Sequence, residues 1–215
     1  MTQKIELFDF FRSGASYRLR IALNLKQLSY TQAPVNLRAR EHMSGEFREL
    51  NPQGLVPVLR IQDRALIQSP AIVEWLEERY PNPPLLPGDS DDRAHVRALA
   101  AIIGCDVHPL CNLRVLNRLR NVFEQDEAGV NAWCHEWISS GLAAYQGLMM
   151  QQPAGKFSFG DTPSIADVYL IPQLAAARRF HLDLAVYPEL LRVERSAAEL
   201  DAFARAAPER QPDAV

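Results

Sequence analysis

Arg12 and Ser13 have the residue types and the position best suited to chemistry, because they lie where an apolar stretch ends and a helical pattern begins. Glycine and small or hydroxyl residues follow at positions 14–16, as in a helix cap and first turn. The first N–H groups of a helix have no partner within it and carry the positive end of its dipole. These residues therefore predict an anion site, although on this stretch alone an ordinary capped joint between a strand and a helix is an equally good interpretation.

A second pattern of this kind is formed by Gln68 and Ser69, at the junction of a predicted strand and a predicted helix. Ser69 and the first helical N–H groups could hold a carboxylate while the Gln68 amide adds a donor, and a plain cap is the alternative. Pro57 stands between Val56 and a predicted strand, where it cannot donate to a sheet ladder. We expect there either a sheet edge or a cis peptide bond that turns the backbone towards a ligand.

The three cysteines, Cys105, Cys111 and Cys134, are odd in number and lack the spacing of metal ligands. This pattern is typical of reduced thiols in a cytosolic protein, and no metal site is expected. Cys105 and Cys111 could be reactive, but buried and unreactive thiols are more common.

The elements that must position these residues follow from the apolar pattern. Residues 5–11 and 29–35 read as strands on either side of a helix at 16–26, which makes a βαβ unit. Charged residues dominate 37–50, so a mobile, partly helical surface segment is expected. The runs 58–61 and 65–67 predict a hairpin, and Ser69 is expected to cap a helix that ends at Tyr80.

A linker rich in proline and aspartate then separates two domains, predicted as 1–83 and 93–215 with 84–92 between them. The second domain reads as helices throughout, with a kink or break at Pro109 and a long helix at 126–150. A helix from Ser164 to about Arg178 begins with a variant of the capping box, in which Asp167 follows the hydroxyl by three residues. The tail 208–215 is expected to be exposed.

Composition indicates a globular protein, since 47% of its 215 residues are hydrophobic and 23% are charged. The net charge of −3 argues against a nucleic-acid surface, which needs a clustered excess of Lys and Arg. No signal peptide or membrane-spanning run is recognisable. We therefore expect a cytoplasmic enzyme or binding protein with no nucleic-acid or membrane partner.

Five stretches together carry a family resemblance: RSGASYRLRIAL at 12–23, LNPQGLVPVL at 50–59, IQSPAIVEWLEERYP at 67–81, FGDTPSIADVYLIPQ at 159–173 and RRFHLDLAVYP at 178–188. On these the chain resembles a zeta-class glutathione transferase, a group that includes maleylacetoacetate and maleylpyruvate isomerases. The resemblance implies a thioredoxin-like α/β N-terminal domain, an all-α C-terminal domain, glutathione as the cofactor and a homodimer.

The resemblance also implies roles for individual residues. Val56 and Pro57 would meet the cysteinyl part of glutathione, Gln68 and Ser69 its γ-glutamyl group, and Ser13 its sulfur. Arg12 and Arg179 match the positions that hold the carboxylates of a dicarboxylate substrate, whereas Arg178 is expected to be a surface neighbour. A further group could reach glutathione from the second domain or from the partner subunit, namely Asp106, His108 and Asn112.

The implied reaction is a cis–trans isomerisation of a maleyl keto acid, maleylacetoacetate or maleylpyruvate, to its fumaryl form in aromatic amino acid or aromatic acid catabolism. Gly14 and Ala15 depart from the usual class pattern, which has a serine and a cysteine there, and Leu113 stands where an additional substrate arginine is expected. The substrate is therefore left open between these compounds and a relative of them. The alternatives are a general transferase that conjugates electrophiles such as α-halo acids, and a non-catalytic interaction protein.

Overall fold

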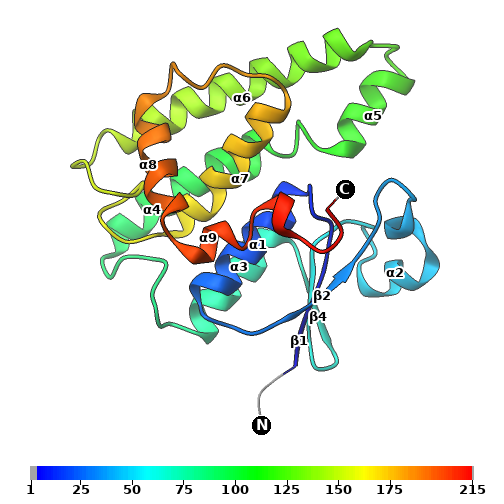
Figure 1. Ribbon diagram of the computed structural model, residues 1–215, viewed down its shortest axis with the longest axis horizontal. Coiled ribbons are helices and arrows are strands. Elements are labelled where there is room, and N and C mark those ends of the chain that lie inside the picture. The colour runs from blue at the N-terminus through cyan, green and yellow to red at the C-terminus, as the bar shows by residue number, and fades with distance from the viewer. Residues whose placement is uncertain (1–3, 215) are drawn as a thin grey trace. The chain divides into compact units, whose positions relative to one another are not determined.

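The computed structural model describes residues 4–214 and divides the chain into two compact units (Figure 1). One unit contains the chain up to Pro84 together with the part from Leu200 onward, and the other is Leu85–Glu199. This differs from the expected division, in which 84–92 was a linker and everything from 93 onward belonged to the second domain. The last part of the chain returns to the first unit because buried polar side chains bind it there.

The first unit is built on a four-stranded sheet with the order β2-β1-β3-β4. Its strands are β1 (Ile5–Asp9), β2 (Thr31–Pro34), β3 (Val58–Ile61) and β4 (Arg64–Ile67). β1 pairs parallel to β2 and antiparallel to β3, and β3 and β4 form the predicted hairpin. β1 and β2 are shorter than the runs that predicted them, β3 matches its run, β4 begins one residue earlier than predicted, and β1 ends at Asp9.

Helices cover both faces of this sheet. α1 (Gly14–Leu25) and α3 (Ser69–Arg79) pack against each other on the face to which Leu7 and Leu59 point. The opposite face is covered by the segment that contains η1 (Glu41–Met43) and α2 (Gly45–Leu50), where Phe47 packs with Phe8 and Val58. The C-terminal segment adds α9 (Asp201–Ala204), which packs against α1, and η3 (Pro208–Arg210).

The second unit is helical, as predicted. Its elements are α4 (Ser90–Ala101), the π-helix η2 (Ile102–Val107), α5 (Leu113–Asn121), α6 (Glu127–Met149), α7 (Ile165–Arg179) and α8 (Pro188–Ala198). α7 is buried along most of its length and packs against α4, η2 and α8, so it forms the centre of this unit (Figure 1). Pro109 lies in the turn between η2 and α5, where it separates two helices.

The start of α7 shows the predicted capping arrangement. The fully buried carboxylate of Asp167 accepts hydrogen bonds from the backbone N–H of Ser164 at 2.8 Å, from the Ser164 hydroxyl at 3.0 Å and from the Ser158 N–H at 2.8 Å. Glycine allows η2 to approach its neighbours closely, because a Cβ on Gly104 would lie 2.7 Å from the Tyr169 ring. The centre of this unit therefore depends on both polar caps and close packing.

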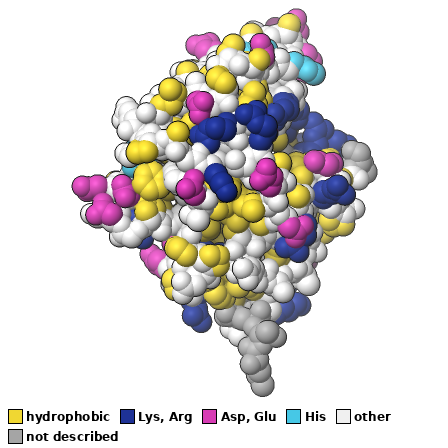
Figure 2. Space-filling view, turned by 60° about the vertical axis from the view of Figure 1, so that its left-hand side comes forward, with side chains coloured by type: hydrophobic (Ala, Val, Ile, Leu, Met, Phe, Trp, Pro, Cys, Tyr) yellow, Lys and Arg dark blue, Asp and Glu magenta, His cyan; other side chains and the backbone are white. Residues whose placement is uncertain are grey.

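The surface carries charges of both signs. On the face drawn in Figure 2, basic side chains are interspersed with acidic and apolar ones, in keeping with the small net charge of −3. Within residues 4–214, helices long and apolar enough to cross a bilayer are absent.

Candidate functional site

Ser13 is the N-cap of α1, in the turn that connects this helix to β1. Its Oγ accepts a hydrogen bond from the Ser16 N–H at 3.2 Å, and its own N–H donates to the Phe10 carbonyl at 2.9 Å. Since Oγ uses only a lone pair in the cap, the hydroxyl proton can still be donated to a ligand. The N–H groups of Gly14 and Ala15, which have no partner within the helix, add positive potential at the same place. Arg12 is exposed beside them.

Three segments with predicted site residues meet at one end of the sheet. Phe8 pairs with Val58, and Val58 pairs with Ile67. Because both ladders are antiparallel, continuing them beyond these pairs brings Val56 level with Phe10 and Gln68 level with Pro57. The structure thus brings the turn with Arg12 and Ser13, the Val56-Pro57 segment and the start of α3 together, as a site for one extended ligand requires.

The peptide bond between Val56 and Pro57 is cis. Of the two alternatives for Pro57, the structure therefore shows the cis bond, and β3, which follows it, is a central strand of the sheet. Val56 is half-buried and packs against the cluster of Val35, Phe47 and Val58.

Gln68 is the N-cap of α3, and the prediction that Ser69 caps this helix was wrong by one position. Ser69 is the first helical residue and is buried, whereas Gln68 is exposed. Gln68 has a φ of 68°, a conformation that favours glycine, and its side-chain amide donates to the Gln53 side chain. Strained backbone of this kind is concentrated at ligand sites, which supports the anion-binding interpretation of this helix start.

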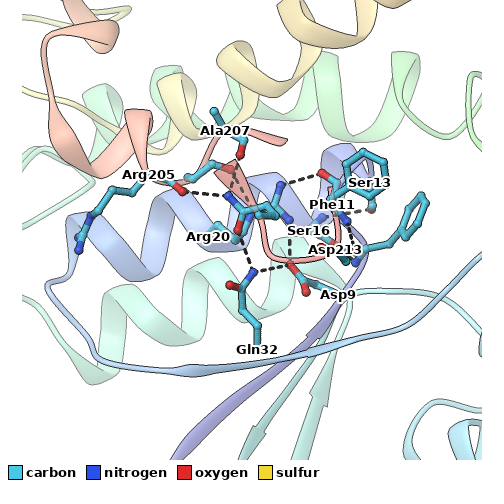
Figure 3. A network of polar contacts seen from close by, with 12 residues as sticks. Asp9, Phe11, Ser13, Ser16, Arg20, Gln32, Arg205, Ala207 and Asp213 are labelled. Carbon is cyan, nitrogen blue, oxygen red and sulfur yellow. Dashed lines mark hydrogen bonds and ion pairs between the residues drawn. The ribbon is translucent and has the colours of Figure 1, made fainter. Parts of the chain in front are cut away.

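A buried ion pair between Asp9 and Arg20 lies directly behind the Ser13 turn (Figure 3), and the sequence analysis missed it. Arg20 donates to Asp9 at 2.7 Å, to the Phe11 carbonyl at 2.9 Å and to the Ala206 carbonyl at 2.9 Å. Burial raises the pKa of Asp9, and the charge of Arg20 offsets this only in part. An aspartate that shares one face of the strand with Ile5 and Leu7 was the available signal, since a buried carboxylate needs a partner.

Arg178 and Arg179 end α7 in the second unit, and the two side chains make different contacts. Arg178 forms a two-pronged ion pair with Glu194 of α8, with both N–O distances at 2.5 Å. Arg179 is exposed, and its guanidinium carbon lies 5.0 Å from the centre of the Phe180 ring. Both arginines are exposed, and their different roles at the site stay a prediction.

Cys111 and Cys134 lie together in the second unit, close enough to Arg179 for its charge to act on both thiols. A hydrogen bond with Cys134, together with burial, raises the pKa of Cys111. A thiol with a raised pKa stays protonated at neutral pH and is a poor nucleophile. Cys111 therefore does not supply the reactive sulfur on its own, although Cys105 is exposed.

The remaining candidates lie around η2. Asp106 is exposed on this π-helix, a type of helix that is rare and frequent at functional sites, and the half-buried His108 follows it. Asn112 is the N-cap of α5, where its side chain accepts a hydrogen bond from the Val115 N–H at 3.1 Å. Leu113 is exposed at the start of α5.

Two family models match the chain. The model described as glutathione S-transferase, N-terminal domain, matches residues 7–84, and the model described as glutathione S-transferase, C-terminal domain, matches residues 138–198. These matches confirm the fold that the resemblance implied, with a thioredoxin-like α/β domain followed by an all-helical domain.

Individual relatives are similar over almost the whole chain. The maleylpyruvate isomerase of Ralstonia sp is 56% identical over 98% of this chain and 100% of its own length. The holo structure of a maleyl pyruvate isomerase, described as a bacterial glutathione S-transferase in zeta class, superposes with a TM-score of 0.96 at 55% identity, covering 98% of this chain and 100% of the other.

A third similar protein is the maleylacetoacetate isomerase of Anaeromyxobacter dehalogenans with GSH bound in its active site. It superposes with a TM-score of 0.90 at 43% identity, over 100% of this chain and 99% of the other. With both domains matched by family models and these relatives matched from end to end, the chain belongs to the zeta class of the glutathione S-transferases.

Proposed function

We propose that this protein is a glutathione-dependent cis–trans isomerase of maleyl keto acids. The observation that carries the proposal is the hydroxyl of Ser13 at the start of α1, beside the two other segments at the end of the sheet, in a chain 56% identical to a maleylpyruvate isomerase. The named relatives act on maleylpyruvate or maleylacetoacetate, both dicarboxylates, and one of them holds glutathione.

The residues at the end of the sheet fit glutathione. The backbone of Val56, ahead of the cis Pro57, would pair with the cysteinyl part, and the α3 start with Gln68 and Ser69 would suit the γ-glutamyl carboxylate. The glutathione sulfur would then lie at the Ser13 hydroxyl. The additional roles of Asp106, His108 and Asn112 in glutathione binding rest on the family resemblance, as do a homodimer and a cytoplasmic location.

Ser13 and the start of α1 would prepare the sulfur for reaction. A free thiol has a pKa of about 8.5, so most of it is protonated at neutral pH. A hydroxyl donor and the positive end of a helix both favour the thiolate, and a lowering of the pKa by about one to two units makes the thiolate the main form.

Bound glutathione supplies the chemistry, since its thiolate adds to the cis double bond of the substrate and leaves again once rotation about the resulting single bond has occurred. Arg12 would hold a substrate carboxylate next to Ser13 and stabilise the negative charge that develops on the substrate. Arg179 would hold the second carboxylate, because its planar guanidinium binds a carboxylate through two hydrogen bonds. No proton is gained or lost between substrate and product.

An absorbance assay with maleylpyruvate and with maleylacetoacetate, each with and without glutathione, tests this function. We expect turnover of at least one substrate to its fumaryl isomer, only when glutathione is present. Rapid conjugation of an α-halo acid without isomerisation of either maleyl compound would instead show a general transferase, and turnover without glutathione would refute the proposal.

A further inference from the structure

The turn between β1 and α1 is held partly by bonds within itself. The Phe10 N–H donates to the Ser16 hydroxyl at 3.4 Å, and the Phe10 carbonyl accepts from the Ser13 N–H at 2.9 Å. These local bonds set the shape of the turn near its two ends. The Phe10 carbonyl and the Phe11 N–H belong to one planar peptide group, so whatever orients this peptide also bears on Ser13.

Phe11, in the middle of this turn, is held from outside it. Its N–H donates to the Oδ2 of Asp213 at 3.0 Å, across 202 residues of sequence, and its carbonyl accepts from the buried Arg20 at 2.9 Å (Figure 3). The Phe11 side chain is buried as well. Arg12 and Ser13 follow directly, so a rotation of either peptide group that contains Phe11 atoms would move both residues.

The C-terminal segment that carries Asp213 is itself fastened to the first unit. The side-chain amide of Gln211 donates to the carbonyls of Arg205 at 2.9 Å and Ala207 at 2.7 Å, and its oxygen accepts from Gln32 of β2 at 2.8 Å. Gln211 is buried, so the prediction that the tail 208–215 is exposed was wrong for this residue. Asp213 therefore approaches Phe11 from a fixed support.

Asp213 is also an unusual choice if its role is only to attach the tail. Its second oxygen, Oδ1, is buried and has no hydrogen-bond partner among the residues that the structure describes. Asp9, which pairs with Arg20, likewise has one buried oxygen with no partner among the described residues. Buried polar atoms without partners are rare, and a carboxylate that tolerates one suggests that a strong, charged acceptor is needed at this position.

We propose that Asp213 is a positioning residue for the reaction. By accepting the Phe11 N–H it holds the Phe10–Phe11 peptide, whose carbonyl accepts the Ser13 N–H, and so it keeps the Ser13 hydroxyl and the neighbouring Arg12 in the orientation that glutathione and substrate require. This inference deepens the proposed function and rests on it, since it places the glutathione sulfur at Ser13.

The test compares Asp213→Ala, Asp213→Asn and the control Asn24→Ala. Asn24 donates to the Ala202 carbonyl at 2.9 Å, so its replacement removes one bond between α1 and the same C-terminal segment but none at the turn. The measurements are amide hydrogen exchange at Phe11 in the protein without glutathione, the pKa of the bound glutathione thiol from its thiolate absorbance, and kcat and KM for the isomerisation.

For Asp213→Ala we expect faster exchange at Phe11, a higher pKa of the bound thiol and a kcat lowered roughly tenfold. Asp213→Asn keeps a neutral acceptor and should lie between this variant and the wild type in all three measurements. Asn24→Ala should match the wild type in thiol pKa and kcat.

Faster exchange at Phe11 with an unchanged thiol pKa and an unchanged kcat would show a purely structural role and overturn the inference. If Asp213→Ala does not fold, Asp213→Asn decides, because wild-type values in that variant would also overturn it. A wild-type protein that lowers the thiol pKa but isomerises neither maleyl compound would refute the proposed function and leave the positioning role standing.

Discussion

The Oγ of Ser13 accepts a hydrogen bond from the backbone N–H of Ser16, so the hydroxyl proposed to contact the glutathione sulfur also caps α1. Ser13→Ala should therefore cost stability and activity together. We expect the free energy of unfolding to fall by about 1 kcal/mol from the lost cap. Loss of a hydrogen bond to a charged sulfur should lower kcat/KM roughly tenfold to a hundredfold, measured in the isomerase assay.

Ser44 offers a matched control, because it caps α2 in the same unit and accepts the Phe47 N–H at 3.1 Å. Ser44→Ala should lose a similar amount of stability and retain wild-type kcat/KM. Equal activity losses in the two variants would mean that Ser13 acts only as a cap.

Arg178 and Arg179, the last two residues of α7, allow substrate binding to be distinguished from a general effect of surface charge. Arg179→Ala, like Arg12→Ala, should raise KM for the maleyl substrate roughly tenfold or more because a carboxylate loses its charged partner, while the Kd for glutathione stays near the wild-type value. Arg178→Ala removes only the partly exposed pair with Glu194 and should leave KM unchanged. A KM raised by Arg178→Ala but not by Arg179→Ala would contradict the assignment of the substrate carboxylate to Arg179.

Gln68 and Gln62 are both exposed glutamines with positive φ, at 68° and 54°, but only Gln68 begins a helix at the site. Replacing either by glycine relieves the backbone and should change the free energy of unfolding by less than about 1 kcal/mol. Only Gln68→Gly should weaken glutathione binding, by roughly fivefold to tenfold in titration calorimetry, because it removes the amide donor. Unchanged affinity in Gln68→Gly would remove this side chain from the glutathione site.

The buried carboxyl of Asp167 should make the free energy of unfolding depend on pH. Burial raises its pKa, despite the hydrogen bonds from Ser158 and Ser164 that lower it. The folded protein therefore binds a proton more readily than the unfolded chain, and this carboxyl stabilises the fold most below its unfolded pKa of about 3.9. That contribution is lost as the pH rises through the folded-state pKa.

The measurement is the difference in free energy of unfolding between the wild type and Asp167→Asn across pH. The variant should be less stable by about 1–3 kcal/mol, since the amide keeps only one acceptor oxygen and the N–H of either Ser158 or Ser164 loses its partner. The advantage of the wild type should shrink as the pH rises towards neutrality, and an advantage that grows with pH would contradict the raised pKa of Asp167.

Local patterns in the sequence predicted what local physics determines. The hairpin around Gln62, the capping box at Asp167 and the break at Pro109 depend on neighbours within a few residues, and the structure shows all three. The cap of α3 was predicted at Ser69 but lies at Gln68. A glutamine with positive φ is unusual, and only the surrounding fold stabilises it there.

Contacts between distant parts of the chain could not be predicted from patterns among neighbouring residues. Asp9 lies in a predicted strand and Arg20 in a predicted helix, but nothing in their spacing indicated that they pair. The tail with Gln211 and Asp213 is polar and was predicted to be exposed. It packs on the first unit because Asp213 accepts the N–H of Phe11, 202 residues away in the sequence. The candidate site residues were found because they follow helix starts and a family pattern, and the residues that support them were not.

The central claim is that the start of α1 holds the glutathione sulfur as a thiolate beside Ser13. Titration of the thiolate absorbance of glutathione bound to the wild type, with Ser13→Ala measured in parallel, tests it most directly. We predict a pKa for the bound thiol about one to two units below the free value of about 8.5, and a return towards the free value in Ser13→Ala. A bound thiol that titrates like free glutathione in the wild type would contradict the claim.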